Sequence, residues 1–221
     1  VMDSDFKQYH LWFETHLEFW EFSLRDEDCE GFGVDHVHEE LERITRESPD
    51  ARKRTTNVKA HMTKWNMTDH VPFKILCNKV EKTIQDFFHE NTSLDIETFM
   101  TTCWGSIYQK GDYSEVHAHV PALYSWVYYV DVDDYAAPLH FPRKILGTIP
   151  EGLGGRDSTS ENAGFFYKPK SGTGVIFPGW FEHQVPEHTG EKERVIVVGN
   201  VEGAGSVQYP QKQRNFTIVE G

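Results

Sequence analysis

One short segment of the chain combines a carboxylate and two imidazoles at alternating positions. Glu115, His117 and His119 follow a Lys-Gly-Asp turn at the end of a strand-like run. In an extended chain alternate side chains share a face, so all three side chains can point into one cavity. Imidazole and carboxylate groups are suitable ligands for Fe(II), Mn(II), Zn(II) or Cu(II). A chain with 12 histidines contains such pairs by chance, so this segment alone does not establish a metal site.

Another histidine follows an apolar strand farther along the chain. Residues 172–178 form a glycine turn followed by an apolar run, and His183 comes just beyond them. A strand in this place can present His183 at the rim of a barrel, where a sheet partner could bring it opposite the segment of His117. The alternative role for His183 is a rim histidine bonded to a backbone carbonyl.

An arginine opens a third segment of interest, the apolar strand 194–200. Its even-numbered residues, from Arg194 to Asn200, share one face of the strand. An arginine at this place can offer a planar, bidentate donor to a carboxylate inside a barrel. The alternative is a surface ion pair with Glu191 or Glu193.

These side chains must be positioned by strands, and the second half of the chain provides them. From about residue 97 onward, runs of β-branched and aromatic residues alternate with Gly, Pro and Asp turns. Such a series is typical of an antiparallel β-sandwich or jelly roll. The expected strands are 99–108, 122–132, 139–141, 164–167, 174–178, 194–201 and 215–219.

The first half of the chain predicts helices instead. Residues 72–91 are the clearest, because a proline opens them and apolar residues recur on one face. Residues 35–47 predict a short amphipathic helix. Aromatic spacing over residues 9–20 favours a helix, although residues 13–22 also suit an aromatic strand. Residues 47–57 predict a loop.

The expected fold class is therefore α+β, mainly β: a double-stranded β-helix (jelly roll, cupin-like) with N-terminal supporting helices. We expect a single domain over residues 1–221, with residues 1–96 as mainly helical support and residues 97–221 as the β core. Hydrophobic residues make up 38% of the chain and aromatic residues 14%, which is enough to build a core and excludes a disordered chain.

The charge balance excludes several classes of partner. There are 22 basic and 35 acidic residues and no long Lys/Arg stripe, so we expect neither nucleic acid nor membrane binding. Charged residues interrupt any signal-peptide core in the first 25 residues. Cys29, Cys77 and Cys103 are widely spaced and form no disulfide framework, so we expect a reducing, cytoplasmic location. The oligomeric state is left open.

Taken together, these pieces resemble the 2-oxoglutarate and Fe(II)-dependent oxygenases, especially the prolyl-hydroxylase-like branch and its phage and bacterial members of unknown substrate. The resemblance spans roughly residues 104–201 and leaves the N-terminal hundred residues unmatched. The matching order is Tyr108-x-x-Gly111, His117-x-His119, the aromatic strand 124–130, residues 172–178, His183 and Arg194.

The resemblance implies a double-stranded β-helix that holds iron with a facial triad, usually His-x-Asp/Glu and a distal His. By position, it implies His117 and His183 as ligands and as catalytic residues. It also implies Arg194 as the anchor for the far carboxylate of 2-oxoglutarate, with Tyr108 bonded to the same group. The cofactors implied are Fe(II), 2-oxoglutarate as cosubstrate, and O2.

The chain departs from the usual pattern where His119 stands in place of the carboxylate. The phage and bacterial subgroup often shows His-x-His, then an S-x-V-Y-Y strand and a later P-R, and this chain has both at residues 125–129 and 142–143. We therefore expect His119 to be the third ligand, with Glu115 in reserve. Further candidates for cosubstrate binding are Tyr129, Ser125, Asn200 and Arg143.

The expected function is hydroxylation of an unidentified small molecule or peptide side chain. Two alternatives are a three-histidine, cupin-type dioxygenase without 2-oxoglutarate and a non-catalytic metal-binding β-sandwich. Arg194 discriminates against the first, because an enzyme that binds its substrate directly does not need a keto-acid anchor. Oxygen- and iron-dependent turnover would exclude the second.

Overall fold

The computed structural model describes residues 7–12, 16–48, 52–54, 57–91, 97–142 and 164–204. Its helices are η1 (Asp26–Cys29), α1 (Val34–Glu47), η2 (Met67–Asp69) and α2 (Val71–Asn91). The strands from the first half of the chain are β1 (Lys7–Trp12), β2 (His16–Ser23), β3 (Arg52–Arg54) and β4 (Val58–Met62). Those that follow are β5 (Glu97–Tyr108), β6 (Tyr113–His117), β7 (Tyr124–Asp131), β8 (Leu139–Pro142), β9 (Gly164–Tyr167), β10 (Thr173–Pro178), β11 (His183–Val185) and β12 (Arg194–Ala204).

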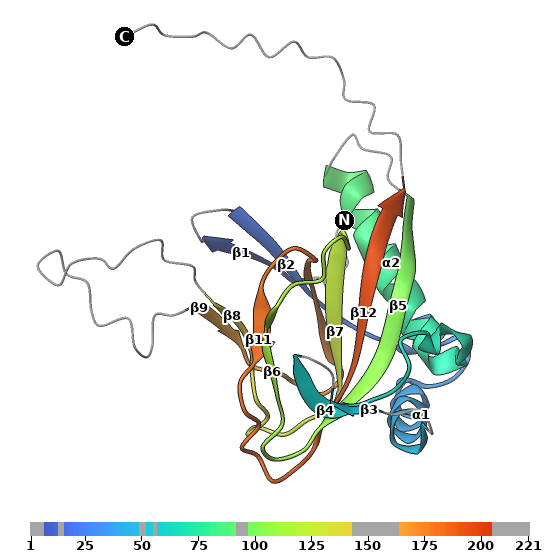
Figure 1. Ribbon diagram of the computed structural model, residues 1–221. Coiled ribbons are helices and arrows are strands. Elements are labelled where there is room, and N and C mark those ends of the chain that lie inside the picture. Colours follow the sequence, from blue (N-terminus) through green and yellow to red (C-terminus); the bar gives the residue numbers. More distant parts are fainter. Residues whose placement is uncertain are drawn as a thin grey trace, which may run out of the picture.

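The strands of the described residues join into one curled, antiparallel sheet. Its order is β1-β2-β10-β7-β12-β5-β4-β6-β11-β8-β9, with β3 paired to β4 at the side. Figure 1 shows β6, β11 and β8 facing the long strands β7, β12 and β5. Ring contacts join the two layers: the ring centroids of Phe141 on β8 and Phe177 on β10 are 5.1 Å apart. The architecture is the predicted jelly roll.

The long strands are buried on both faces, and their residues divide between two apolar clusters by alternation. On β7, Trp126 and Tyr128 belong to the cluster beneath the helices, whereas Val127 and Tyr129 belong to the cluster inside the jelly roll. Each fully buried large apolar side chain contributes about 1.5–3 kcal/mol to folding. Because the long strands are packed on both faces, the side chains on their inner face have fixed positions.

The two α-helices, α1 and α2, cover the outer face of β5, β7 and β12 (Figure 1). Helix α2 buries Phe73, Leu76, Val80 and Ile84, which recur at helical spacing along one face. Helix α1 approaches β5 so closely that a Cβ on Gly105 would lie 2.2 Å from the Thr45 hydroxyl oxygen. No helix among the residues described is long and apolar enough to cross a membrane.

The structure confirms most predicted elements and corrects others. The helices expected at 35–47 and 72–91 are α1 and α2, and six of the predicted strands are present. The helix expected over residues 9–20 is wrong, because β1 and β2 form a hairpin there. The loop expected over residues 47–57 contains β3. The strand expected at 215–219 lies outside the described residues.

The N-terminal error has a packing cause. Strand β2 pairs with β10 and buries Phe19 in the inner cluster but Trp20 and Phe22 in the outer one. Adjacent aromatic residues that are buried on opposite faces suit a strand covered on both sides, and helical spacing alone does not distinguish that case. This half of the chain thus supports the core with strands as well as helices.

Candidate metal centre

Strand pairing brings two of the predicted histidines together. Strand β11 runs antiparallel to β6, and His183 is the Cα partner of His117. The next pair is Val185 with Ser114, so β6 carries one residue more than β11 between the two pairs. Such a β-bulge interrupts the alternation of side chains.

The bulge explains why Glu115 is not part of the site. Strict alternation predicted that Glu115 and His117 share a face, yet Glu115 and Val116 are both exposed while Ser114 is buried. The reserve ligand Glu115 therefore does not belong to the cluster of possible ligands that the described residues form.

The third histidine, His119, lies just beyond β6, in the loop that leads to β7. Its backbone N–H donates to the carbonyl oxygen of Gly179, 2.7 Å away, in the loop between β10 and β11. Gly179 N–H in turn donates to Leu123 at 3.0 Å. A Cβ on Gly179 would lie 2.3 Å from the Ala122 carbonyl oxygen, so only glycine lets the two loops approach this closely.

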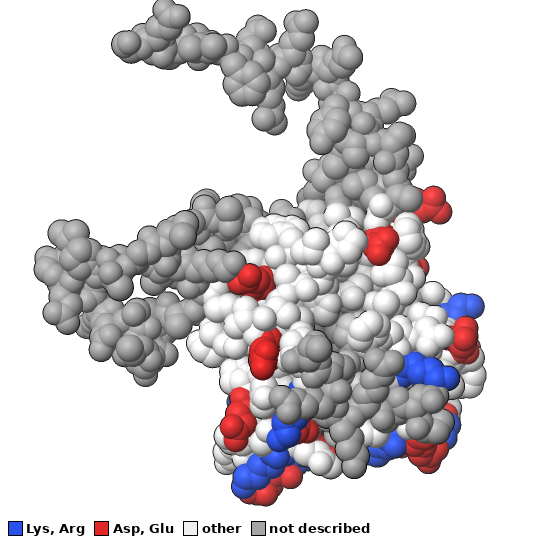
Figure 2. Space-filling model, in the orientation of Figure 1, with Lys and Arg blue, Asp and Glu red and all other residues white. Residues whose placement is uncertain are grey.

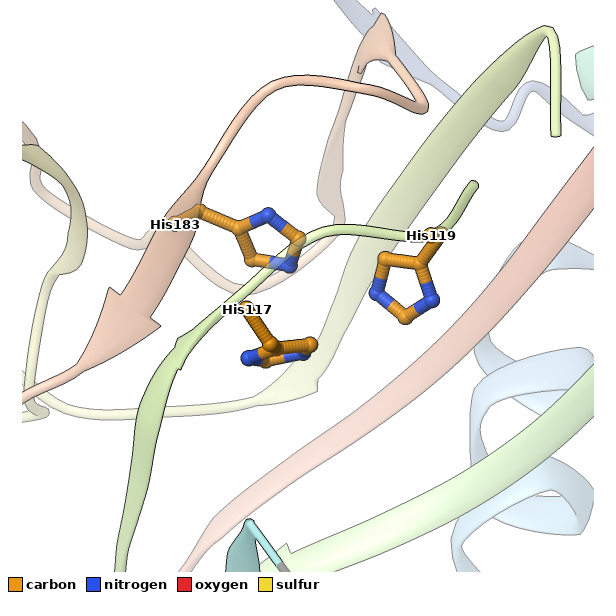
Figure 3. Close-up of side chains that lie close together, drawn as sticks. All are labelled: His117, His119 and His183. Carbon is orange, nitrogen blue, oxygen red and sulfur yellow. The ribbon is translucent and has the colours of Figure 1, made fainter. Parts of the chain in front are cut away.

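The three imidazoles converge on one point, as Figure 3 shows. One nitrogen of each of His117, His119 and His183 lies within 4.8 Å of those of the other two. The ring centroids of His117 and His183 are 4.5 Å apart, and the His119 ring stacks on His183 at 5.1 Å. Three imidazoles so arranged can hold a divalent transition-metal ion and leave positions open for other ligands.

Two of these rings are oriented by the backbone. Nδ1 of His117 is 2.7 Å from the Glu115 carbonyl oxygen, and Nδ1 of His183 is 3.0 Å from that of Phe181. A carbonyl only accepts, so each Nδ1 carries the proton and each Nε2 keeps its lone pair. The backbone-bonded rim histidine considered for His183 is thus realised, and it is compatible with a ligand role through Nε2.

The environment also keeps the rings neutral. Burial lowers the pKa of His117, and burial together with the neighbouring His117 lowers the pKa of His119 to about 4. His183 is 4% exposed, and burial lowers its pKa well below the usual value. Neutral imidazoles are ready to bind a metal ion without first releasing a proton.

An apolar shell that the sequence did not reveal surrounds the cluster. Phe177 on β10 lies 4.8 Å from His183, ring centroid to ring centroid, and Trp104 on β5 lies 6.1 Å from His119. Both side chains come from strands that were predicted, and their inward face could have been read from alternation. The pairing of distant strands that places them beside the histidines could not.

Deeper in the jelly roll, Arg194 begins β12 and is fully buried, at 0% exposed. Its guanidinium carbon lies 4.9 Å from the ring centre of Tyr108 and 5.2 Å from that of Tyr129. Val198, four residues farther along β12, pairs with Trp104 beside His119. The rise of a strand places the start of β12 roughly 13 Å from that row. On the inner face, we call the end with Arg194 the floor and the end with the three clustered histidines the mouth.

Apart from the hydroxyl of Tyr129, the three guanidinium nitrogens of Arg194 have no hydrogen-bond partner in the described part of the chain, and no carboxylate pairs with them there. The surface ion pair considered as an alternative is wrong, because Glu193 binds Arg46 and Gln109, while Glu191 binds Lys110. A buried cation without a partner is costly, so the geometry calls for an anionic ligand.

The two tyrosines beside Arg194 are suited to complete an anion site. Burial raises the pKa of Tyr129 to about 12, although the positive charge of Arg194 partly offsets the effect. Its hydroxyl is buried, and its only partner among the described residues is the side chain of Arg194, which donates and leaves the hydroxyl proton without an acceptor. Burial also raises the pKa of Tyr108, whose hydroxyl hydrogen-bonds Ser114. Both phenols therefore stay protonated and keep a donor for a carboxylate.

The remaining candidates for cosubstrate binding are not beside Arg194. The hydroxyl of Ser125 donates to Oδ1 of Asn200 at 2.8 Å, and Nδ2 of Asn200 donates to the hydroxyl of Thr102 at 2.9 Å. Asn200 is six residues from Arg194 along β12, which corresponds to roughly 20 Å. Arg143 lies outside the described residues.

Comparison with known proteins agrees with this geometry. Residues 102–200 match the family model described as "Putative 2OG-Fe(II) oxygenase". That segment is therefore similar to the 2OG-Fe(II) oxygenase family. It contains all three clustered histidines as well as Arg194, Tyr108 and Tyr129. Enzymes of this family depend on Fe(II) and 2-oxoglutarate, with O2 as the usual co-substrate. A search of curated proteins finds no match.

Solved structures show the same fold at low sequence identity. A viral collagen prolyl hydroxylase from Paramecium bursaria Chlorella virus-1, in complex with 2-oxoglutarate, is 15% identical with a TM-score of 0.56, over 84% of this chain and 96% of that one. A prolyl hydroxylase from Trichoplax adhaerens, in complex with a hypoxia-inducible-factor peptide fragment, is 14% identical with a TM-score of 0.58, over 83% of each chain.

A third neighbour has a metal ion bound as well as 2-oxoglutarate. HygX from Streptomyces hygroscopicus, with nickel and 2-oxoglutarate bound, is 8% identical with a TM-score of 0.55, over 83% of this chain and 82% of that one. These likenesses confirm the jelly-roll fold of the oxygenases. The family match, rather than the fold, argues against the cupin-type dioxygenase and the non-catalytic β-sandwich.

The residues present fit the two groups that the family requires. Three neutral imidazoles can hold Fe(II), and an unpartnered buried guanidinium beside two protonated phenols can hold a carboxylate. The histidine cluster itself includes no carboxylate among the residues described. A dianionic keto acid that spans the cavity would supply negative charge at both ends.

Proposed function

We propose that His117, His119 and His183 hold Fe(II) and that Arg194 binds the distal carboxylate of 2-oxoglutarate, in an enzyme that hydroxylates a small molecule or a peptide side chain. The observation that supports this most is Arg194, which is fully buried, has no carboxylate partner among the described residues and belongs to the same inner face of the jelly roll as the three histidines. A site for a metal and a separate site for an anion in one cavity match a chelating dicarboxylate.

In this proposal the protein positions and shields the reacting groups. Bound Fe(II) with 2-oxoglutarate supplies the oxidising chemistry with O2. Arg194, Tyr108 and Tyr129 bind the distal carboxylate and so fix the orientation of the keto acid. Trp104 and Phe177 exclude water from the side of the histidines.

The direct test is anaerobic addition of 2-oxoglutarate to the Fe(II)-loaded protein. Chelation of iron by a keto acid gives a weak visible charge-transfer band, and we expect this band together with one bound Fe(II) per chain. Calorimetry should show 2-oxoglutarate binding that depends on the metal. Iron binding without the band and without a calorimetric signal would contradict the proposed role of Arg194.

We further infer that the polar group of the substrate meets the network of Ser125, Asn200 and Thr102. Ser125 pairs with Phe177, whose ring contacts His183, and Thr102 is two residues from Trp104, whose ring lies near His119. These neighbours place the network beside the histidines and away from Arg194. This assignment departs from the role in cosubstrate binding expected from sequence.

The surface around the mouth favours an uncharged substrate with an apolar part. Trp65, Val120 and Trp180 are 53%, 72% and 54% exposed, which is unusual for such large apolar groups. Among the described residues of the face drawn, Figure 2 shows mainly residues other than Lys, Arg, Asp and Glu over the upper part, with scattered Asp and Glu, while residues of both charges lie along the lower part and the right edge.

A substrate survey can test this assignment. We would measure O2-dependent consumption of 2-oxoglutarate with proline-containing peptides, free amino acids and aminoglycosides, and compare the wild-type chain with Asn200→Leu. We expect Asn200→Leu to keep its affinity for 2-oxoglutarate within about twofold and to lose stimulation by any compound that stimulates the wild type. A tenfold loss of 2-oxoglutarate affinity would return Asn200 to the cosubstrate site.

We also propose a cytoplasmic location for the protein. The three cysteines are free, which supports this proposal.

A further inference from the structure

The three imidazoles of the cluster are not held in the same way. His117 and His183 form a cross-strand pair, and each donates Nδ1–H to a backbone carbonyl two residues earlier. Such a bond fixes both the tautomer and the plane of a ligating imidazole, which is why metal-binding histidines almost always make one. These two rings therefore need no further support.

His119 lacks this support. Neither nitrogen of its ring has a hydrogen bond within the described part of the chain, although its backbone N–H is bonded to Gly179 at 2.7 Å. The backbone of His119 is thus fixed while its ring is held only by its neighbours. One neighbour is His183, stacked at 5.1 Å, and the other is Trp104, at 6.1 Å and tilted by 42°.

Trp104 is itself backed by a second tryptophan. The ring centroids of Trp104 and Trp65 are 6.2 Å apart, and Trp104 is 8% exposed while Trp65 is 53% exposed. The segment of Trp65 is fastened to β5 on both sides of Trp104: Cys103 N–H donates to the Trp65 carbonyl at 2.8 Å, and Gly105 N–H donates to the Thr63 hydroxyl at 3.0 Å.

We propose that Trp104, backed by Trp65, is the positioning residue for His119 and replaces the missing hydrogen bond with aromatic packing. The inference rests on the proposed function, because it takes His119 as a metal ligand. An edge or tilted aromatic contact has a preferred geometry and a modest strength. It holds the ring of His119 near the other two without dictating which of its nitrogens binds.

The proposal gives a role to an exposed tryptophan. An exposed residue such as Trp65 usually contributes little to folding, and its replacement is usually neutral. If Trp65 supports His119 through Trp104, its replacement must instead be felt at the metal. Phe32 offers a control, because it is a 45% exposed aromatic residue that stacks on His36 of α1 rather than on Trp104.

The test uses Co(II), whose visible spectrum reports coordination geometry independently of turnover. Co(II) affinity and the absorption spectrum would be measured for the wild type, Trp65→Leu, Phe32→Leu and Trp104→Leu, each checked for folding by circular dichroism. We expect Trp65→Leu to weaken Co(II) binding by about two- to tenfold and to change the spectrum. Trp104→Leu should have a larger effect, Trp104→Phe should restore part of it, and Phe32→Leu should match the wild type.

A double-mutant cycle separates positioning from a general effect on the fold. In a His119→Ala background, Trp65→Leu should cause no further loss of Co(II) affinity, because the ring that it supports is gone. Equal losses in both backgrounds, or equal effects of Trp65→Leu and Phe32→Leu, would overturn the positioning role and leave the proposed function intact. Failure of the wild-type chain to bind Co(II) at all would instead overturn the proposed metal centre and, with it, this inference.

Discussion

The mouth and the floor of the inner face of the jelly roll are suited to ligands of opposite charge. The mouth holds three neutral imidazoles, two of them oriented by backbone carbonyls, and is suited to a cation. The floor holds one fully buried guanidinium between two phenols and is suited to an anion. The difference supports the proposal that a ligand with a chelating group and a distal carboxylate would bind at both ends.

The ends also differ in what their lack of a ligand costs the protein. Neutral imidazoles can remain in an apolar shell at modest cost, whereas an unpartnered buried cation carries a large desolvation penalty. Changes at the mouth should therefore act mainly on metal binding, and changes at the floor should act on both 2-oxoglutarate binding and stability.

Removal of a ligand at the mouth should have the largest effect. We expect His119→Ala to lose Fe(II) affinity by more than about 100-fold, because a direct ligand matters more than the outer partners that orient ligands. Glu115→Ala should retain its iron, since Glu115 is exposed and outside the cluster. His119→Asp should bind some iron but turn over more slowly, because aspartate is shorter than the imidazole that shapes the cavity.

Metal titrations of these three variants, each checked for folding, provide the measurement. Full iron occupancy in His119→Ala together with loss of iron in Glu115→Ala would show that the ligands include Glu115 rather than His119. The metal would then be held by a carboxylate and two imidazoles, not by three imidazoles.

Replacement of Arg194 at the floor should have the next largest effect. Arg194→Leu should weaken 2-oxoglutarate binding by about ten- to a hundredfold, because a charge-assisted bidentate contact contributes about 1.5–3 kcal/mol, and should leave metal content nearly unchanged. The same variant should unfold at higher urea concentration than the ligand-free wild type, since a buried, unpartnered charge is removed. Calorimetry and urea titration measure the two effects.

Arg46→Leu is a suitable control for the floor. Arg46 is a partly exposed arginine paired with Glu193 and Glu42 on the outer surface, so its loss should alter neither 2-oxoglutarate affinity nor, beyond a small decrease, stability. Unchanged 2-oxoglutarate binding in Arg194→Leu would assign the anchor to another residue, with Arg143 the next candidate from sequence.

The sequence revealed the parts of this cavity that depend on local patterns. His183 and Arg194 were recognisable because each stands at the end of an apolar strand, where a side chain can enter a barrel. Strands such as β7 and β12 were recognisable because double burial leaves continuous apolar and aromatic runs. Alternation predicted that His117 and His119 share a face, and the family resemblance favoured His119 over Glu115, although His119 lies beyond the end of β6.

The parts that the sequence did not reveal depend on pairing between distant segments. The bulge in β6 turned Glu115 outward and Ser114 inward, and it exists only because β11 pairs there with one residue fewer. The distance between Asn200 and Arg194 was implicit in strand rise, but the partners of Asn200 on β5 and β7 required the register of three strands. Trp65 gave no signal, because its role depends on contact with β5.

We expect the smallest effect from replacing the two tyrosines at the floor, and these replacements test whether the two phenols are equivalent. The hydroxyl of Tyr129 has only the side chain of Arg194 as a partner, and that side chain cannot accept its proton, whereas the hydroxyl of Tyr108 already hydrogen-bonds Ser114. A carboxylate on Arg194 would give Tyr129 its only acceptor, so Tyr129→Phe should weaken 2-oxoglutarate binding by about two- to tenfold, the range expected for one net hydrogen bond. Tyr108→Phe should have a smaller effect, because that hydroxyl divides its bonding between the ligand and Ser114. Without ligand, Tyr129→Phe should be about as stable as the wild type, since a buried hydroxyl without an acceptor is removed. Calorimetry with 2-oxoglutarate and urea unfolding of the ligand-free variants check both expectations. A larger loss in Tyr108→Phe than in Tyr129→Phe would show that the carboxylate approaches Arg194 from the side of Tyr108, and would make Ser114 part of the floor.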